Sequence, residues 1–134
     1  KIYFFFFEEN DYSKRANKLG FYSYQINSIK IYHEHGNSVK TKNLKDRNVI
    51  NLLTAWHFTW SKFYYFKKHY NYFLALIYLL PLIVRCFFKK FYYSSNKKSY
   101  NFQKYNVRSD AILASIKNRK SYAREESIIK LNKF

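Results

Sequence analysis

One long apolar segment in the middle of the chain constrains this sequence more than any other feature. Residues 70–88 (YNYFLALIYLLPLIVRCFF) hold a single charged side chain, Arg85, and residues 73–84 are apolar almost throughout. At 1.5 Å per residue, a helix of this length is about 30 Å long, which matches the hydrocarbon core of a bilayer. We therefore predict a single membrane-spanning helix over residues 69–90.

A buried central helix of a water-soluble or ribosomal protein is the alternative interpretation, because a strictly apolar stretch this short is often a core helix. The charged flanks favour the membrane. Lys67 and Lys68 precede the segment, Lys89 and Lys90 follow it, and Arg85 lies near enough to one end for its long side chain to reach the headgroups. We expect these five cations to bind anionic lipid, with cardiolipin as the expected lipid.

The segment before the apolar stretch has the periodicity of an amphipathic helix. Over residues 47–68 apolar side chains recur at helical spacing and include Trp56, Trp60 and Tyr64. Because such rings favour the headgroup level, we expect these three, with Tyr92 beyond the span, to lie at the membrane interface. The alternative is that the same stripe is the core face of an ordinary helix.

The N-terminal part, residues 1–46, is a basic arm. Tyrosine and isoleucine alternate with polar residues over 21–32, which predicts one or two short strands or an extended arm.

The C-terminal part, residues 91–134, is a second basic extension. It begins with a polar linker over 94–106, and short helices are predicted to start near Ser109 or Asp110 and near Ser121. Two short helices build no core of their own, so we expect them to dock on a partner. The predicted fold is therefore all-α and elongated, with an interfacial amphipathic helix, one transmembrane helix, basic extended arms and short C-terminal helices.

The charge balance predicts a polyanionic neighbour. The chain carries 25 Lys and Arg against 8 Asp and Glu, a net charge of +17. Anionic lipid and RNA are the two candidates, and lysines interleaved with aromatic rings over 97–108 suit an RNA-threading tail. Arginine is scarce, however, and no RNA-recognition signature is present. RNA binding therefore remains the alternative to lipid contact.

Residues that carry catalysis are nearly absent. The dense cluster His33, Glu34 and His35 would place two imidazoles on one face of an extended segment, but two ligands do not make a metal site. The thiolate of Cys86 is disfavoured in its apolar surroundings, and the two glycines form no phosphate loop. We expect a non-enzymatic protein with no metal and no cofactor.

The skewed amino-acid composition of the chain resembles that of a known group of proteins. Phe, Tyr, Ile, Asn and Lys supply 72 of the 134 residues, which is the signature of strong AT pressure on the coding genome. This skew, the FFFF and KKFYY runs and the single hydrophobic segment resemble mitochondrion-encoded proteins of ciliates and similar protists. Many of those proteins are subunits of respiratory complexes, the ATP synthase or the mitochondrial ribosome. The organisation is similar to that of subunit 8 of the ATP synthase, although here the apolar segment is central rather than N-terminal.

The resemblance implies a non-catalytic structural subunit of a mitochondrial inner-membrane complex, either a respiratory complex or the ATP synthase. Its partners would be protein subunits, cardiolipin and the membrane. The alternative is a mitochondrial ribosomal protein that binds rRNA through its basic, aromatic arms.

Overall fold

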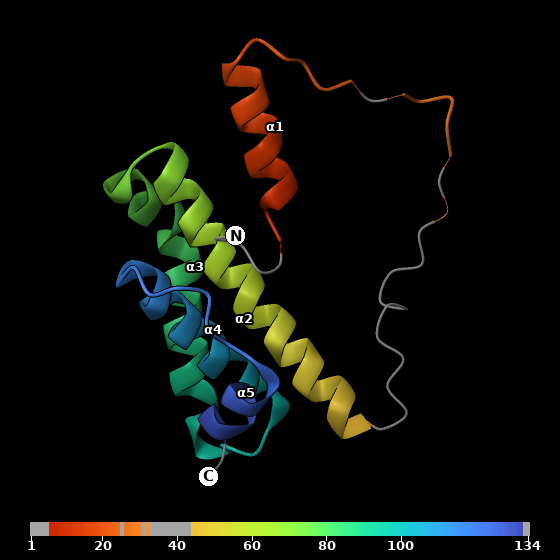
Figure 1. Ribbon diagram of the computed structural model, residues 1–134. Helices are drawn as coiled ribbons and strands as arrows, with labels where there is room; N and C mark the ends of the chain where they lie inside the picture. The colour runs from red at the N-terminus through yellow and green to blue at the C-terminus, as the bar shows by residue number, and fades with distance from the viewer. Residues whose placement is uncertain (1–5, 25, 31, 33–43, 133–134) are drawn as a thin grey trace.

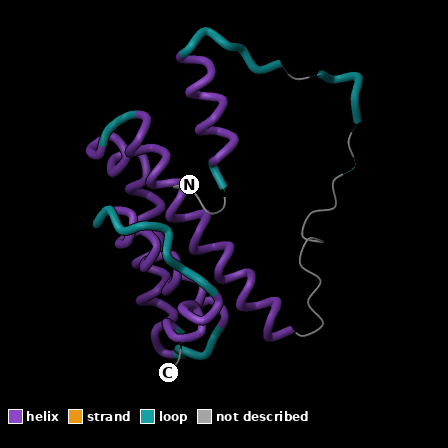
Figure 2. The backbone as a smooth tube through the Cα atoms, viewed as in Figure 1, coloured by secondary structure: helices purple, strands orange, loops and turns teal. Residues whose placement is uncertain are grey.

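The computed structural model describes residues 6–24, 26–30, 32 and 44–132, and this part of the chain is helical, without a strand (Figures 1 and 2). The elements in chain order are α1 (Glu8–Lys18), α2 (Leu44–His69), α3 (Tyr72–Tyr92), the short 3₁₀ helix η1 (Tyr93–Ser95), α4 (Tyr100–Ile116) and α5 (Glu125–Leu131).

Helices α2, α3 and α4 pack side by side as an up-down-up bundle, and α5 covers α2 (Figure 1). Short polar connections reverse the chain at each end. The Asn71 side chain caps α3 by accepting a 2.8 Å hydrogen bond from the Leu74 amide. The Ser99 hydroxyl caps α4 by accepting a 3.2 Å hydrogen bond from the Phe102 amide.

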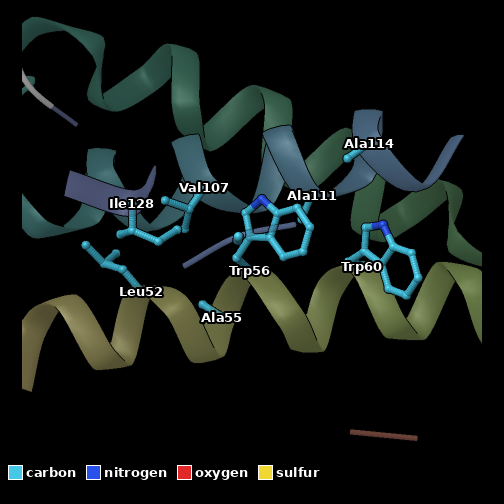
Figure 3. Packing of buried hydrophobic residues seen from close by; sticks show 9 residues of the cluster. Leu52, Ala55, Trp56, Trp60, Val107, Ala111, Ala114 and Ile128 are labelled. Atoms are coloured by element: carbon cyan, nitrogen blue, oxygen red, sulfur yellow. The ribbon is translucent and has the colours of Figure 1, made fainter. Parts of the chain in front are cut away.

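The core lies between α2 and α4. Trp56 and Trp60 point from α2 toward α4 and stack with their ring centroids 6.4 Å apart (Figure 3). The facing side of α4 carries small residues, which leave room for the two indoles between the helices. The residues of α4 and α5 that complete this cluster are Val107, Ala111, Ala114 and Ile128.

The chain after α4 turns back and crosses the core. Asn118 adopts the left-handed conformation (φ 56°) that often ends helices, and the Arg119 amide donates back to the carbonyl of Ala114 at 2.8 Å. His57 of α2 then holds the returning loop in place. Its ring nitrogens lie 2.9 Å from the Ser121 hydroxyl oxygen and 3.1 Å from the Ala123 carbonyl oxygen.

Helix α1 is held against the C-terminal end of α2 by one carboxylate. Asp11 is buried and accepts hydrogen bonds from Arg15 at 3.0 Å, Lys68 at 2.6 Å and His69 at 2.7 Å. Lys14 adds a cation–π contact, with its Nζ 3.7 Å from the ring centroid of Tyr70. Helix α1 was not predicted from the sequence, although its acidic first turn and basic last turn suit the helix dipole.

The structure corrects two expectations for the C-terminal part. The helix predicted to start at Ser109 or Asp110 already begins at Tyr100, so half of the expected linker is helical. The C-terminal helices pack on α2 of the same chain, whereas they were predicted to dock on a partner protein. In the N-terminal arm, the described parts of 21–32 form neither strand nor helix, so the short strands predicted there are absent from these residues and the alternative of an arm without regular structure is the one that agrees.

Candidate membrane-contacting surface

Within the described residues, one helical stretch, Tyr72–Ser95, is long and apolar enough to cross a membrane. Only 17% of its most apolar window is buried inside the protein. The core helix of a water-soluble protein would have most of this surface covered, and α3 does not. The surface that α3 leaves open is therefore the candidate functional site.

The inner face of α3 packs on α2 and α4. Ala75, Leu79 and Cys86 are buried on this face at spacings of four and seven residues, which place them on one side of the helix. Phe63 of α2 and Ile116 of α4 pack against the same cluster. This contact fixes which side of α3 turns outward.

The outer face of α3 is a continuous apolar stripe, which we call the outer seam. Its side chains follow one another at alternating steps of four and three residues, so they lie along one line down the helix. Phe73, Ile77 and Phe91 are 75%, 67% and 79% exposed, although each is a large apolar side chain. The seam consists of Phe73, Ile77, Leu80, Val84, Phe87 and Phe91.

A further exposed row, formed by Leu74, Pro81 and Phe88, lies beside the outer seam and widens the apolar surface. A line of polar groups follows beyond this row, and we call it the polar edge. Tyr78, Arg85 and Tyr92 follow at intervals of seven residues, about two helical turns, and all three side chains are exposed. The Nζ atom of Lys89 lies 5.4 Å from the ring centroid of Tyr92, so this lysine extends the edge. The seven-residue spacing of these three residues is present in the sequence, but Tyr78 was not among the predicted site residues.

The five predicted lipid-binding cations separate into two groups. Lys67 donates to the carbonyl of Ser115 at 3.2 Å and to the Asn118 side chain, and burial lowers the pKa of its amine. Lys68 is engaged by Asp11. Both lysines therefore hold the fold together. The three cations of α3 lie near the apolar surface, and they are Arg85, which is exposed, and Lys89 and Lys90, which are half-buried.

The four predicted interfacial aromatics also separate. Trp56 and Trp60 are fully buried, and the indole of Trp60 donates a 3.1 Å hydrogen bond to the carbonyl of Arg119. This corrects the interfacial placement of both residues: they form the core face of α2, which was the alternative interpretation of the stripe. Tyr64 is half-buried and stacks on Trp60 with ring centroids 5.0 Å apart, whereas Tyr92 is exposed.

Metal-binding groups do not gather in the described part of the chain. No group of three or more His, Cys, Asp or Glu side chains is placed to hold a metal ion there. The cluster of His33, Glu34 and His35 lies outside the described residues. A depression of about 750 Å³ between α1 and α2 is lined mainly by polar side chains such as Glu9 and Lys14.

Comparisons with known proteins add no assignment. No protein-family model, no curated protein and no solved structure matches this chain. The function is therefore argued from the geometry of α3 and from the composition of the sequence.

Proposed function

We propose that this protein is a non-catalytic structural subunit of a mitochondrial inner-membrane complex, either a respiratory complex or the ATP synthase. It joins the membrane through α3 and contacts the other subunits through the rest of the helical bundle. One observation carries the proposal: the outer seam of α3 is a continuous line of exposed large apolar side chains, on a helical stretch whose most apolar window is only 17% buried.

The outer seam is large enough that its removal from water, by lipid or by another protein, is strongly favourable. Burying one large apolar side chain contributes about 1.5–3 kcal/mol, so transfer of the six seam residues out of water is favourable by on the order of 10 kcal/mol. Contiguous exposed apolar patches of this kind mark membrane or protein contact sites. A single aromatic or aliphatic residue on the surface would carry no such implication.

The charge of the chain supports a lipid environment for this surface. The net charge is +17, and Arg85, Lys89 and Lys90 lie on the apolar helix itself, which carries no acidic residue. Basic residues beside an inserted helix are attracted to anionic headgroups by about 1 kcal/mol each. Cardiolipin, which carries two phosphates, is the expected lipid.

The mitochondrial assignment is supported by composition. The AT-biased alphabet and its resemblance to mitochondrion-encoded protist proteins support synthesis inside the organelle. Subunits of the respiratory complexes and the ATP synthase are prominent among such products.

Carbonate extraction of purified mitochondria, followed by native electrophoresis, tests the proposal. We expect the chain to stay in the membrane pellet and to co-migrate with a respiratory complex or the ATP synthase after mild solubilisation. Release by carbonate, with co-sedimentation on ribosomal particles before extraction, would overturn the proposal and favour the mitochondrial ribosomal alternative.

A further inference from the structure

We infer that α3 lies in the plane of the membrane surface, with the outer seam embedded in one leaflet, and does not cross the bilayer. This inference rests on the proposed membrane function and specifies how the same surface meets the lipid. The occupant of the seam is the acyl region of an anionic bilayer, and the polar edge lies at the headgroups of that leaflet.

The direction of the polar edge is the first argument. In a helix that crosses a bilayer, polar side chains collect at the two ends, where the headgroups are. In a helix that lies in the interface, they run along one side, parallel to the axis. Tyr78, Arg85 and Tyr92 run along the side of α3, and Arg85 stands seven residues before the helix ends. This line of side chains is therefore placed as expected for a helix that lies in the membrane surface, with the polar edge at the level of the headgroups.

The inner face of α3 is the second argument. If α3 left the bundle to cross the membrane alone, lipid would replace the contacts that Ala75 and Leu79 lose. The partners on the other helices would have no such replacement, since Phe63 and Ile116 would then face water. An in-plane α3 keeps these contacts and still removes the outer seam from water.

The polar surface of the rest of the bundle is the third argument. If the whole bundle crossed with α3, polar and charged side chains of α4 would enter the hydrocarbon layer, where they are costly. Lys104, Arg108 and Asp110 of α4 are only partly buried, and Asn101 is exposed. Thr54 of α2 is exposed as well. Among the described helices, α3 is the one that is apolar enough over its length, and exposed enough, to present a continuous apolar face to a membrane.

The charge pattern fits the same arrangement. Arg85 is exposed, and within the part of the chain that the structure describes it forms no hydrogen bond or ion pair. At the level of the headgroups, its guanidinium reaches lipid phosphates, which it binds in bidentate fashion. Lys89 lies on the same side, so one edge of α3 presents two cations to the headgroups.

Labelling of two single-cysteine variants from outside the vesicles tests the inference. Both start from Cys86→Ala, so that the buried native thiol does not react. Leu19→Cys places a reporter before α3 in the chain, and Ser95→Cys places one after it; both positions are exposed. Each variant is bound to preformed vesicles of phosphatidylcholine and cardiolipin and treated with a membrane-impermeant maleimide, before and after detergent is added.

An in-plane α3 gives complete labelling of both reporters without detergent, because the two ends of the helix stay on the outer side. A crossing helix leaves one of the two reporters unlabelled until detergent opens the vesicle, and that result would overturn the inference while leaving the membrane function intact. If neither variant floats with the vesicles, the proposed membrane function itself fails.

A third variant tests directly whether the outer seam is embedded in lipid, and circular dichroism checks that the variants keep their fold. Val84→Cys, also made on Cys86→Ala, places a thiol in the middle of the outer seam, where the native side chain is exposed. It should react freely in the absence of vesicles and become protected when vesicles are added. Equal reactivity with and without vesicles would contradict embedding of the seam. The helix content of all three variants, measured by circular dichroism, should match that of Cys86→Ala.

Discussion

The indole N–H of Trp56 donates a 2.8 Å hydrogen bond to the carboxylate of Asp110, a residue 54 positions further along the chain. This bond joins α2 to α4 and places the ring of Trp56 in the core. The same carboxylate oxygen accepts a 2.7 Å hydrogen bond from the hydroxyl of Tyr122. Burial, together with this bond to a carboxylate, raises the pKa of Tyr122 to about 12, so the phenol keeps its proton.

Removing the charge of Asp110 should weaken the bundle. Asp110→Asn keeps the size of the side chain and replaces a charged acceptor of two hydrogen bonds with a neutral one. We expect a loss of about 1–2 kcal/mol in the free energy of unfolding, measured by guanidinium denaturation with tryptophan fluorescence. The matched control, Glu126→Gln, removes an exposed carboxylate and should change stability by about 0.5 kcal/mol or less. Equal losses in the two variants would contradict a structural role for Asp110.

The stability of the fold should fall in mildly acidic solution because of His57. Burial lowers the pKa of this imidazole from 6.5 to about 4, and the nearby Arg124 charge acts in the same direction, although the bond to Ala123 opposes it. Between these two pH values the unfolded chain binds a proton that the folded chain does not. The stabilisation is therefore complete above pH 6.5 and is lost as the pH falls toward 4, by about 3 kcal/mol in total.

The variant His57→Gln isolates this effect, since the other titrating groups remain in both proteins. Its unfolding free energy should change less than that of the unmodified chain over the same pH interval. Parallel pH profiles for the two proteins would show that His57 does not control acid stability.

The attachment of α1 should depend on Asp11. Burial raises the pKa of this carboxyl group, but hydrogen bonds from Lys68, His69 and Arg15 outweigh burial and lower it below the usual range. Its contribution is therefore present above the ordinary carboxyl range and is lost only as the pH falls below it. At neutral pH, α1 should stay docked.

The variant Asp11→Asn should release α1 without unfolding the bundle. We expect amide hydrogen exchange in α1 to accelerate by about tenfold, which corresponds to the loss of a charged hydrogen bond worth about 1.5 kcal/mol. Glu9→Gln, a matched change at an exposed position on the same helix, should leave α1 protected. Unchanged exchange in Asp11→Asn would rule out the carboxylate as the tether.

Charge reversal on α3 should weaken lipid binding. The double variant Lys89→Glu/Lys90→Glu should bind vesicles that contain cardiolipin at least about thirtyfold more weakly, because each lysine contributes about 1 kcal/mol near an anionic surface. The control Lys120→Glu/Lys130→Glu makes the same change in net charge at exposed positions outside α3. Equal weakening in a flotation assay would mean that net charge alone matters and that the flank of α3 has no special role.

Sequence periodicity located the two long helices well. The predicted ranges 47–68 and 69–90 lie within three residues of α2 (Leu44–His69) and α3 (Tyr72–Tyr92) at each boundary. Helical spacing and apolar content are local properties, so they can be read without knowledge of the fold. The start of α4 was missed by about ten residues, because the polar segment before Ser109 carries no strong apolar stripe.

The sequence by itself determined that the chain is helical, that one helix is apolar enough for a membrane, and that its flanks are basic. Only the tertiary structure decided what covers each helical face. Trp56 and Trp60 face the small residues of α4 and not a headgroup layer, and α3 has one face on the bundle and one face open. Periodicity defines a face but not the surface packed against it, because that contact joins residues distant in the chain.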